Sequence, residues 1–211
     1  MGPDVNGDVA GEEFGGHVEI SRDGIRVAVG SPESDTLLDN AGKVSVFEYD
    51  AGEASWSQVG GDILGEGSGD KSGSSFSLSG DGGRVAVGAD KNDDGGANAG
   101  HVRVFEFVSV SNSWDQVGSD INGEAAIDLS GRSVSLSDDG SRVAIGATLN
   151  DGTDTSAGHV RVYELVGGVW TQLGADIDGE AAGDQSGISV SLSSAGSVLA
   201  IGAFLNDGAA G

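Results

Sequence analysis

The sequence predicts an all-β protein made of β-propeller blades, each with four short antiparallel strands. Three observations predict this class: a repeat of nearly constant length, apolar residues that alternate with small polar ones, and a high glycine content. RVAVG at Arg26–Gly30 recurs at Arg84–Gly88, as RVAIG at Arg142–Gly146 and as VLAIG at Val198–Gly202, at spacings of 58, 58 and 56 residues. Glycine makes up 39 of the 211 residues and proline only 2, which favours short strands and turns over long helices.

The third unit illustrates the elements in order. Ser133–Ser137 alternates as SVSLS and predicts the first strand, and the turn sequence DDG at Asp138–Gly140 leads into the second strand at Arg142–Gly146. A polar, glycine-rich loop follows, and then HVRVYEL at His159–Leu165 predicts the third strand. WTQLG at Trp170–Gly174 predicts the fourth. Four hairpin-connected strands repeated about every 57 residues are typical of a propeller blade.

The repeat divides the chain into blades of one repeat domain, residues 1–211. The blades cover roughly residues 1–60, 61–118 and 119–174, and residues 175–211 form a partial blade. About 3.5 blades are therefore present. Because closure needs at least about four blades, we expect these residues to belong to a larger ring, or to associate with further blades or other copies.

The segment GRSVSLSDDGSRVAIGA at Gly131–Ala147 resembles the FG-GAP repeat of integrin α-chain propellers and of bacterial and algal surface proteins. Phe14-Gly15 supplies the FG pair once, and Gly146-Ala147-Thr148 stands at the GAP end. The resemblance covers essentially the whole chain. It implies a seven-bladed ring, an extracellular or cell-surface location and a role in adhesion.

The charge and composition of the chain argue against several classes of binding partner. Lys and Arg number 10 and Asp and Glu 34, a formal net charge of −24, which argues against nucleic acid and against anionic membrane surfaces. The chain contains no cysteine, and its longest apolar run, Val198–Leu205, is too short to insert into a membrane. No signal peptide is visible.

Acidic residues recur in register where each blade begins. Four nine-residue segments, Asp4–Glu12, Asp62–Asp70, Asp120–Asp128 and Asp176–Asp184, are acidic at their first, fifth and ninth positions. Oxygen ligands at alternate positions of a loop suit Ca²⁺, and the resemblance implies calcium loops, although the glycine here comes fourth and Leu64 interrupts the second copy. Solvated Asp turns without a metal are the alternative. The candidate calcium ligands are Asp4, Asn6, Asp8, Glu12, Asp120, Asn122, Glu124, Asp128, Asp176, Asp178, Glu180 and Asp184.

A second candidate calcium loop occurs once, as DKNDDGGAN. Its ligands would be Asp90, Asn92 and Asp94, with the glycine at the sixth position as in the family pattern. The following unit has Thr148, Asn150 and Gly152 at these positions and so keeps only the asparagine, and an ordinary polar loop is the alternative.

Catalytic patterns are weak, and the sequence predicts that the chain is not an enzyme. His101 and His159 occupy the position that Lys43 fills in the first unit, which predicts an exposed strand start. We find no nucleophile elbow and no acid that interrupts the repeat to mark one site. A hydrolase with paired carboxylates is a less favoured alternative. A lectin that uses Trp56, Trp114 and Trp170 is also less favoured, because a repeated aromatic residue is typical of packing between blades.

The predicted function is a non-enzymatic extracellular recognition or adhesion module of the FG-GAP type, calcium-stabilised where the acidic loops bind the ion. The loops between second and third strands, Ser31–Gly42, Ala89–Gly100 and Ala147–Gly158, differ most and would form a rim for a protein or glycan ligand. The alternative is a structural repeat module of an extracellular sheath or filament.

Overall fold

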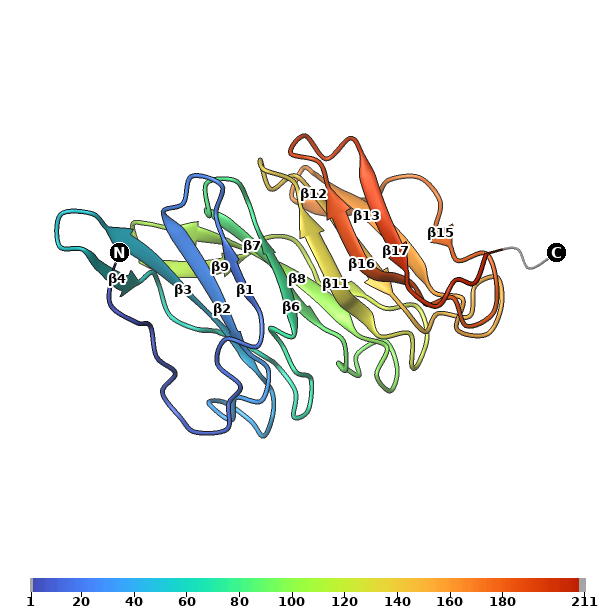
Figure 1. Cartoon of the computed structure of the whole chain (residues 1–211), viewed down its shortest axis with the longest axis horizontal. Helices are drawn as coiled ribbons and strands as arrows, with labels where there is room; N and C mark the ends of the chain where they lie inside the picture. The colour runs from blue at the N-terminus through green and yellow to red at the C-terminus, as the bar shows by residue number, and fades with distance from the viewer. Residues whose placement is uncertain (1, 209–211) are drawn as a thin grey trace.

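The structure is a computed structural model that describes residues 2–208. Every regular element in these residues is a β-strand, which confirms the predicted all-β class. The strands form four antiparallel sheets that lie side by side, from β1–β4 at the blue end to β16–β17 at the red end (Figure 1). Within residues 2–208, no helix is long and apolar enough to cross a membrane.

The first three sheets share one topology, in which four strands lie in chain order and a fifth short strand pairs with the third. The first sheet contains β1 (Val18–Ile20), β2 (Arg26–Ser31), β3 (Lys43–Asp50), β4 (Ser55–Gln58) and β5 (Ile63–Leu64). The second contains β6 (Ser75–Leu78), β7 (Arg84–Ala89), β8 (His101–Val108), β9 (Ser113–Gln116) and β10 (Ile121–Asn122). The third contains β11 (Ser130–Leu136), β12 (Arg142–Ala147), β13 (His159–Val166), β14 (Val169–Gln172) and β15 (Ile177–Asp178), and the fourth contains β16 (Ser186–Leu192) and β17 (Leu199–Ala203).

The two-residue strands β5, β10 and β15 are an addition to the predicted blade. A glycine with positive φ, such as Gly60 (φ 70°), stands two residues after the fourth strand, and the chain then pairs again with the beginning of the third strand. The first residues of the second, third and fourth acidic segments therefore still belong to the preceding blade.

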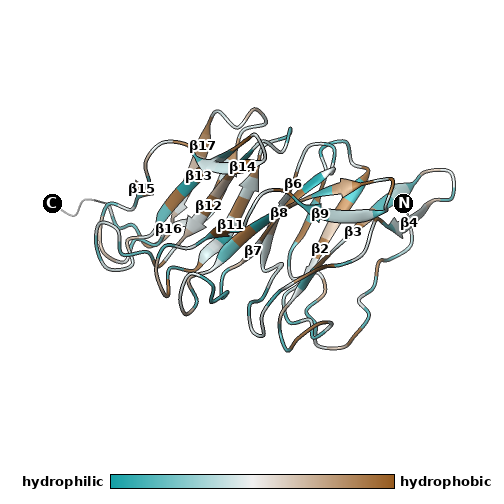
Figure 2. Cartoon of the chain, turned by 180° about the vertical axis from the view of Figure 1, so that it is seen from behind, coloured by the Kyte–Doolittle hydropathy of each residue, from teal (hydrophilic) through white to brown (hydrophobic). Residues whose placement is uncertain are grey.

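The core lies between the sheets, because successive side chains of each strand point to opposite faces. Val85 and Val87 of β7 pack toward the first sheet, whereas Ala86 packs toward the third. Apolar segments accordingly follow the strands, while the loops are mostly polar (Figure 2).

Glycines at two positions of the repeat allow neighbouring blades to approach closely. A Cβ atom on Gly88 would lie 2.3 Å from the carbonyl oxygen of Gly131, and Gly30 has the same relation to Gly73. Gly131 has φ 86°, which few other residues adopt. The glycines of the GAP-like and FG-like ends thus face each other across each junction.

Each tryptophan of the second and third blades docks on the preceding blade. The indole Nε1 of Trp114 donates to the carbonyl of Val59 (2.8 Å), and its ring covers Gly60. Trp170 repeats these contacts on Val117 and Gly118. The tryptophans therefore pack between blades, as the sequence predicts, and they fix the spacing of the outer strands.

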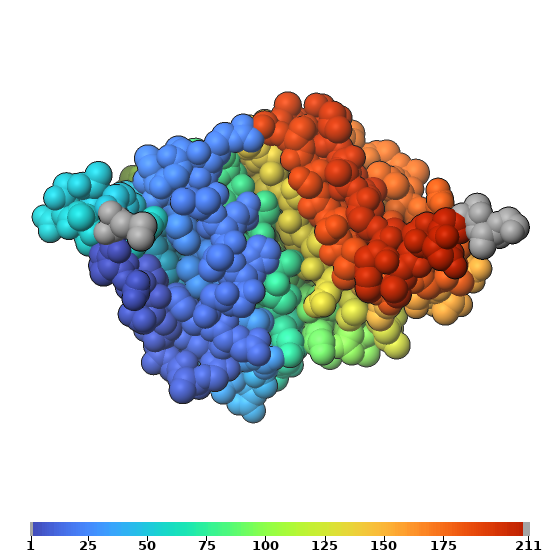
Figure 3. Space-filling view, viewed as in Figure 1, coloured from blue at the N-terminus to red at the C-terminus, as the bar shows by residue number. Residues whose placement is uncertain are grey.

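The turns between first and second strands gather at the opposite end from the acidic segments. Backbone N–H groups of Asp23, Gly80 and Asp138 each donate to a carbonyl in the corresponding turn of the next blade. Arg22 pairs with Asp138 and donates to Ser194, so the first and fourth sheets meet here (Figure 3). The four sheets therefore curve around the first strands β1, β6, β11 and β16.

Candidate functional site

The first residue of the third strand is the centre of an acidic cluster in each complete sheet. Lys43, His101 and His159 hold this position, and we call them the junction residues. Each is at most 2% exposed. Carboxylates reach a junction residue both from the segment that enters the blade and from the segment that leaves it.

Lys43 fills the first junction with its own ammonium group. Its Nζ lies 3.3 Å from Oδ2 of Asp8, 3.2 Å from Oε2 of Glu12 and 3.7 Å from Oδ2 of Asp62. Burial acts to lower the pKa of Lys43, but the hydrogen bonds to Glu12 and Asp8 and the charge of Asp62 outweigh it, so the pKa is raised. A cation is therefore built into this junction.

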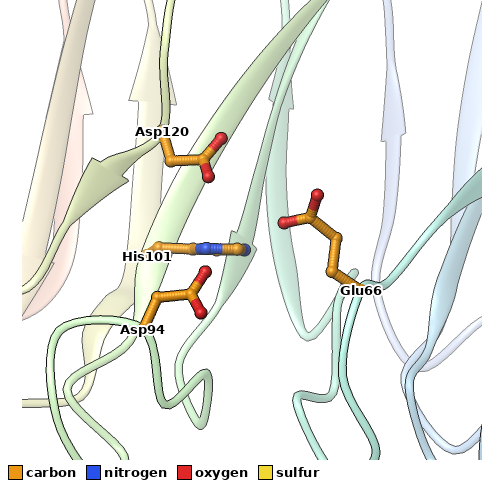
Figure 4. Close-up of side chains that lie close together, drawn as sticks. All are labelled: Glu66, Asp94, His101 and Asp120. Carbon is orange, nitrogen blue, oxygen red and sulfur yellow. The ribbon is translucent and has the colours of Figure 1, made fainter.

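His101 stands at the second junction among three carboxyl groups (Figure 4). Glu66 comes from the loop after β5, Asp94 from the β7–β8 loop and Asp120 from the residue before β10. One ligand atom from each of these four residues lies within 4.8 Å of the others. Gln116 donates from Nε2 to Oδ1 of Asp120 (2.6 Å) and so orients that carboxylate.

The third junction repeats the arrangement with fewer acids. His159, Glu124 and Asp176 form the cluster, and Oδ1 of Asp178 lies 3.9 Å from Nδ1 of His159. Gln172 donates to Oδ1 of Asp176 at 2.6 Å, as Gln116 does to Asp120.

The pKa of each junction histidine lies below its ordinary value. Burial lowers the pKa of His101 and of His159, and the adjacent guanidinium groups of Arg103 and Arg161 lower it further. Nδ1 of each imidazole is buried and has no hydrogen-bond partner in residues 2–208. The prediction of an exposed strand start is therefore wrong at both histidines, because β10 and β15 cover this end of the third strand.

The structure divides the predicted calcium loop at Asp120–Asp128 between two junctions, whereas Asp8 and Glu12 of the first loop both reach Lys43. Asp120 lies beside His101, whereas Glu124, four residues later, lies beside His159. Asn122 and Asp178 lie in β10 and β15, opposite His101 and His159 in register. The two clusters therefore take their ligands from different loops, and neither has one loop wrapped around a single point as the calcium pattern requires.

The ninth residues of these segments hold the loops together. Asp128 accepts at Oδ2 from the backbone N–H of Ala125 (3.0 Å) and from Nδ2 of Asn150 (2.9 Å), and Asp184 repeats both contacts. Oε1 of Glu12 accepts from the backbone N–H groups of Asp8 and Val9. Asp4, Asn6 and Glu180 are exposed.

The single candidate loop at residues 90–98 is divided in the same way. Asp90 pairs with Arg132 (3.1 Å), and Asn92 donates from Nδ2 to Oδ2 of Asp70 (2.9 Å). Only Asp94 joins a metal-sized cluster, beside His101.

A second site lies in a groove of about 330 Å³ along the first strands, where the surface is hollowed between the blue and red ends (Figure 3). Glu19 of β1 accepts from the backbone N–H of Leu78 at Oε2 (2.9 Å) and from Oγ of Ser77 at Oε1 (3.3 Å). Burial raises the pKa of Glu19 to about 7, although both hydrogen bonds lower it.

Glu19 is an acid that interrupts the repeat, contrary to the sequence-based expectation. Ser77 and Ser135 stand at the equivalent positions, and each hydroxyl oxygen accepts from the next first strand. Comparing the first strands position by position would have revealed Glu19. His101 and His159 could also have been identified as site residues from the sequence. Lys43 stands at the same position of the repeat, and a lysine there indicates that acidic residues surround this position.

Comparisons with known proteins support the fold. No protein-family model matches the sequence, and no curated protein matches it. A crystal structure of a candidate 6-phosphogluconolactonase from Bacteroides fragilis is similar, with a TM-score of 0.54 and 14% sequence identity. The match covers 88% of this chain and 41% of that one, so the chain spans less than half the length of that protein. The fold shared with that structure is of the propeller type.

The prediction that the chain is not an enzyme is wrong on this comparison. The protein with which the chain shares its fold is named for an enzymatic activity, so the propeller architecture gives no ground for excluding catalysis. At 14% identity the likeness extends to the fold and not to the reaction.

Proposed function

We propose that the chain is an extracellular recognition module of the FG-GAP kind, which binds a protein or glycan ligand at its loop rim for adhesion. The observation that carries this proposal is a cavity of about 600 Å³ between the entering segment and the β2–β3 loop of the first blade. Four acids line it, of which Glu12 is paired with Lys43 and Glu33 with Lys71. The exposed carboxylates of Glu13 and Asp35 remain, and they suit a ligand with cationic or hydroxyl groups.

The rest of the molecule supports the rim as a fixed platform. Glycine contacts and docked tryptophans hold neighbouring blades together, while the rim loops differ in sequence from blade to blade. A rigid scaffold with variable loops is a common basis for binding. The resemblance to FG-GAP repeats favours a cell-surface location.

A binding assay tests the rim directly. The chain is applied to a glycan array and to Lys- and Arg-rich peptides, and ligands that bind are measured again with Glu13→Gln. Glu13 is exposed and lines the cavity. We expect a severalfold weaker affinity, roughly 3- to 10-fold, because a charge facing the ligand is lost.

Glu53→Gln is the matched control, since Glu53 is exposed in the β3–β4 turn away from the cavity. Equal weakening by both variants would mean that only net charge matters and would contradict a rim site. Concentration-dependent assembly without any ligand would instead favour the structural sheath or filament. Val198, Phe204 and Leu205, which are exposed apolar residues near β17, offer a surface for such assembly.

A second candidate function is acid–base catalysis in the groove of Glu19. A carboxyl group with a pKa of about 7 can both hold and release a proton near neutral pH. A sugar lactone, the substrate class in the name of the similar structure, is one compound to test. A phosphorylated one is disfavoured because Arg22, the basic residue lining the groove, is paired with Asp138.

A further inference from the structure

His101 and His159, which belong to the acidic clusters, each hold a buried imidazole nitrogen without a partner. Nδ1 of His101 and Nδ1 of His159 have no hydrogen-bond partner in residues 2–208, and each side chain is 1% exposed. A buried polar atom without a partner is unfavourable. A neutral imidazole nitrogen among carboxylates is also a common metal ligand.

The spacing at the second junction matches a shared ion. Ligand atoms of Glu66, Asp94, His101 and Asp120 all lie within 4.8 Å of one another. Atoms that each lie about 2 Å from one zinc ion are separated by roughly 3 to 4 Å, so small side-chain movements would complete the site. In Figure 4 the edge of the His101 ring lies between Asp94 and Asp120, and Glu66 faces it from the neighbouring segment.

The charge balance at this junction favours a cation. Three carboxylates approach one another, and Arg103 offsets part of their charge through Nη1, 3.2 Å from Oε1 of Glu66. The other terminal nitrogen of Arg103 donates to the carbonyl of Leu64 at 2.6 Å, which keeps the guanidinium at the side of the cluster.

The first junction shows what such a cluster holds when a cation is supplied by the chain. The Lys43 ammonium group lies within 3.7 Å of Asp8, Glu12 and Asp62. Where histidine replaces lysine, the acidic surroundings remain but the ammonium group is absent. The position has therefore exchanged the lysine ammonium group for an imidazole, and the fixed cation stands two residues further along the strand, as Arg103 beside Glu66 and Arg161 beside Glu124.

We propose that His101 with Glu66, Asp94 and Asp120, and His159 with Glu124 and Asp176, each bind a zinc ion between adjacent blades. Imidazole nitrogen with carboxylate oxygen is a donor set for zinc, whereas calcium prefers six to eight oxygens. Both sites join residues from consecutive acidic segments, so the ion links one blade to the next.

Titration calorimetry of the chelator-treated full chain with Zn²⁺ tests the proposal. We expect about two ions per chain, and a higher melting temperature with Zn²⁺ than with Ca²⁺. His101→Lys combined with Arg103→Ser copies the Lys-Val-Ser of the first blade and should remove one ion while retaining cooperative unfolding.

Asp94→Thr is a second variant, because Asp94 is exposed and threonine stands at the equivalent position of the first blade. It should weaken one site at least about tenfold and leave the other unchanged. This variant decides the matter if the lysine variant does not fold. The matched control is His17→Ser, which copies Ser75 and Ser133 and should still bind about two ions.

Cobalt supplies an independent readout. Co²⁺ bound to the chain should show visible absorption that reports nitrogen ligation, and this absorption should fall by about half when His101 is replaced. Three outcomes would each overturn the proposal. They are no Zn²⁺ binding at about 10 µM, equal Zn²⁺ binding by the His101 and His17 variants, and a rise in melting temperature with Ca²⁺ that equals the rise with Zn²⁺ and survives replacement of His101.

Discussion

At the scale of single residues, one exchange in an otherwise constant position changes the chemistry of a blade. Glu19 takes over the structural hydrogen bond that a serine hydroxyl makes in the next two blades. The exchange keeps the contact between first strands and adds a titratable group to the groove. Its folded pKa of about 7 lies above the ordinary value of 4.5, so the folded chain holds more protons between these values than the unfolded chain does.

Glu19 should therefore make stability fall as pH rises from about 4.5 to 7. Glu19→Gln keeps an acceptor for Leu78 and cannot ionise. Between pH 5 and pH 8 the wild-type chain should lose roughly 1 to 2 kcal/mol more unfolding free energy than the variant, after allowance for solvent screening. Urea unfolding at both pH values measures this.

The same variant separates the two roles of Glu19. Any turnover of sugar lactones or nitrophenyl esters that depends on the groove should be lost in Glu19→Gln and kept in Glu53→Gln. An identical pH dependence of stability in wild type and Glu19→Gln would contradict the burial of an ionisable carboxyl group.

At the scale of elements, the second strand of a blade can approach the next blade only because its penultimate residue is glycine. A Cβ on Gly88 would lie 2.3 Å from the Gly131 carbonyl and 2.4 Å from Oγ of Ser75. Neither neighbour can yield freely, because Oγ of Ser75 donates to that same carbonyl at 2.6 Å. Gly88→Ala must therefore separate two blades.

We expect Gly88→Ala to destabilise the chain by about 1 to 3 kcal/mol in urea unfolding, the usual cost of overpacking. Gly61→Ala is the control, since a Cβ there meets no atom within 4 Å in the described residues and Gly61 does not have positive φ. An equal effect of both substitutions would show that chain flexibility, and not the contact between blades, explains the loss.

At the scale of the whole molecule, a net charge of −24 on 211 residues opposes compaction. Salt screens this repulsion, so the melting temperature in the presence of a chelator should rise by about 5 °C between low and 1 M NaCl. Choline chloride should have a similar effect because it screens equally. A rise with only one cation would instead indicate specific binding.

The repeat made much of the architecture predictable. The spacing of the RVAVG segments placed β2, β7, β12 and β17, because an alternating pattern between glycine-rich turns has few other solutions. The short strands β5, β10 and β15 escaped prediction. Two residues carry too little periodicity, and their pairing depends on where the preceding glycine redirects the backbone.

The candidate sites were harder to predict because they combine residues from different repeats. Glu66 and Asp120 occupy different positions of different acidic segments, and only the stacking of blades brings both to His101. Reading each segment as a separate loop therefore grouped Asp120 with Glu124, which the structure assigns to different junctions. Contacts between successive copies are not visible in the pattern of one copy.

The tryptophan contacts have a consequence for how the chain is made. Gly60 and the Val59 carbonyl belong to the blade that is synthesised first, and Trp114, which covers them, belongs to the blade that follows. Gly118 and Trp170 stand in the same order. During translation each indole therefore emerges after the surface that receives it has been completed. Blades can then fold one at a time from the N-terminus to the C-terminus as they are synthesised. This order limits the time for which the apolar face of any sheet is exposed to solvent.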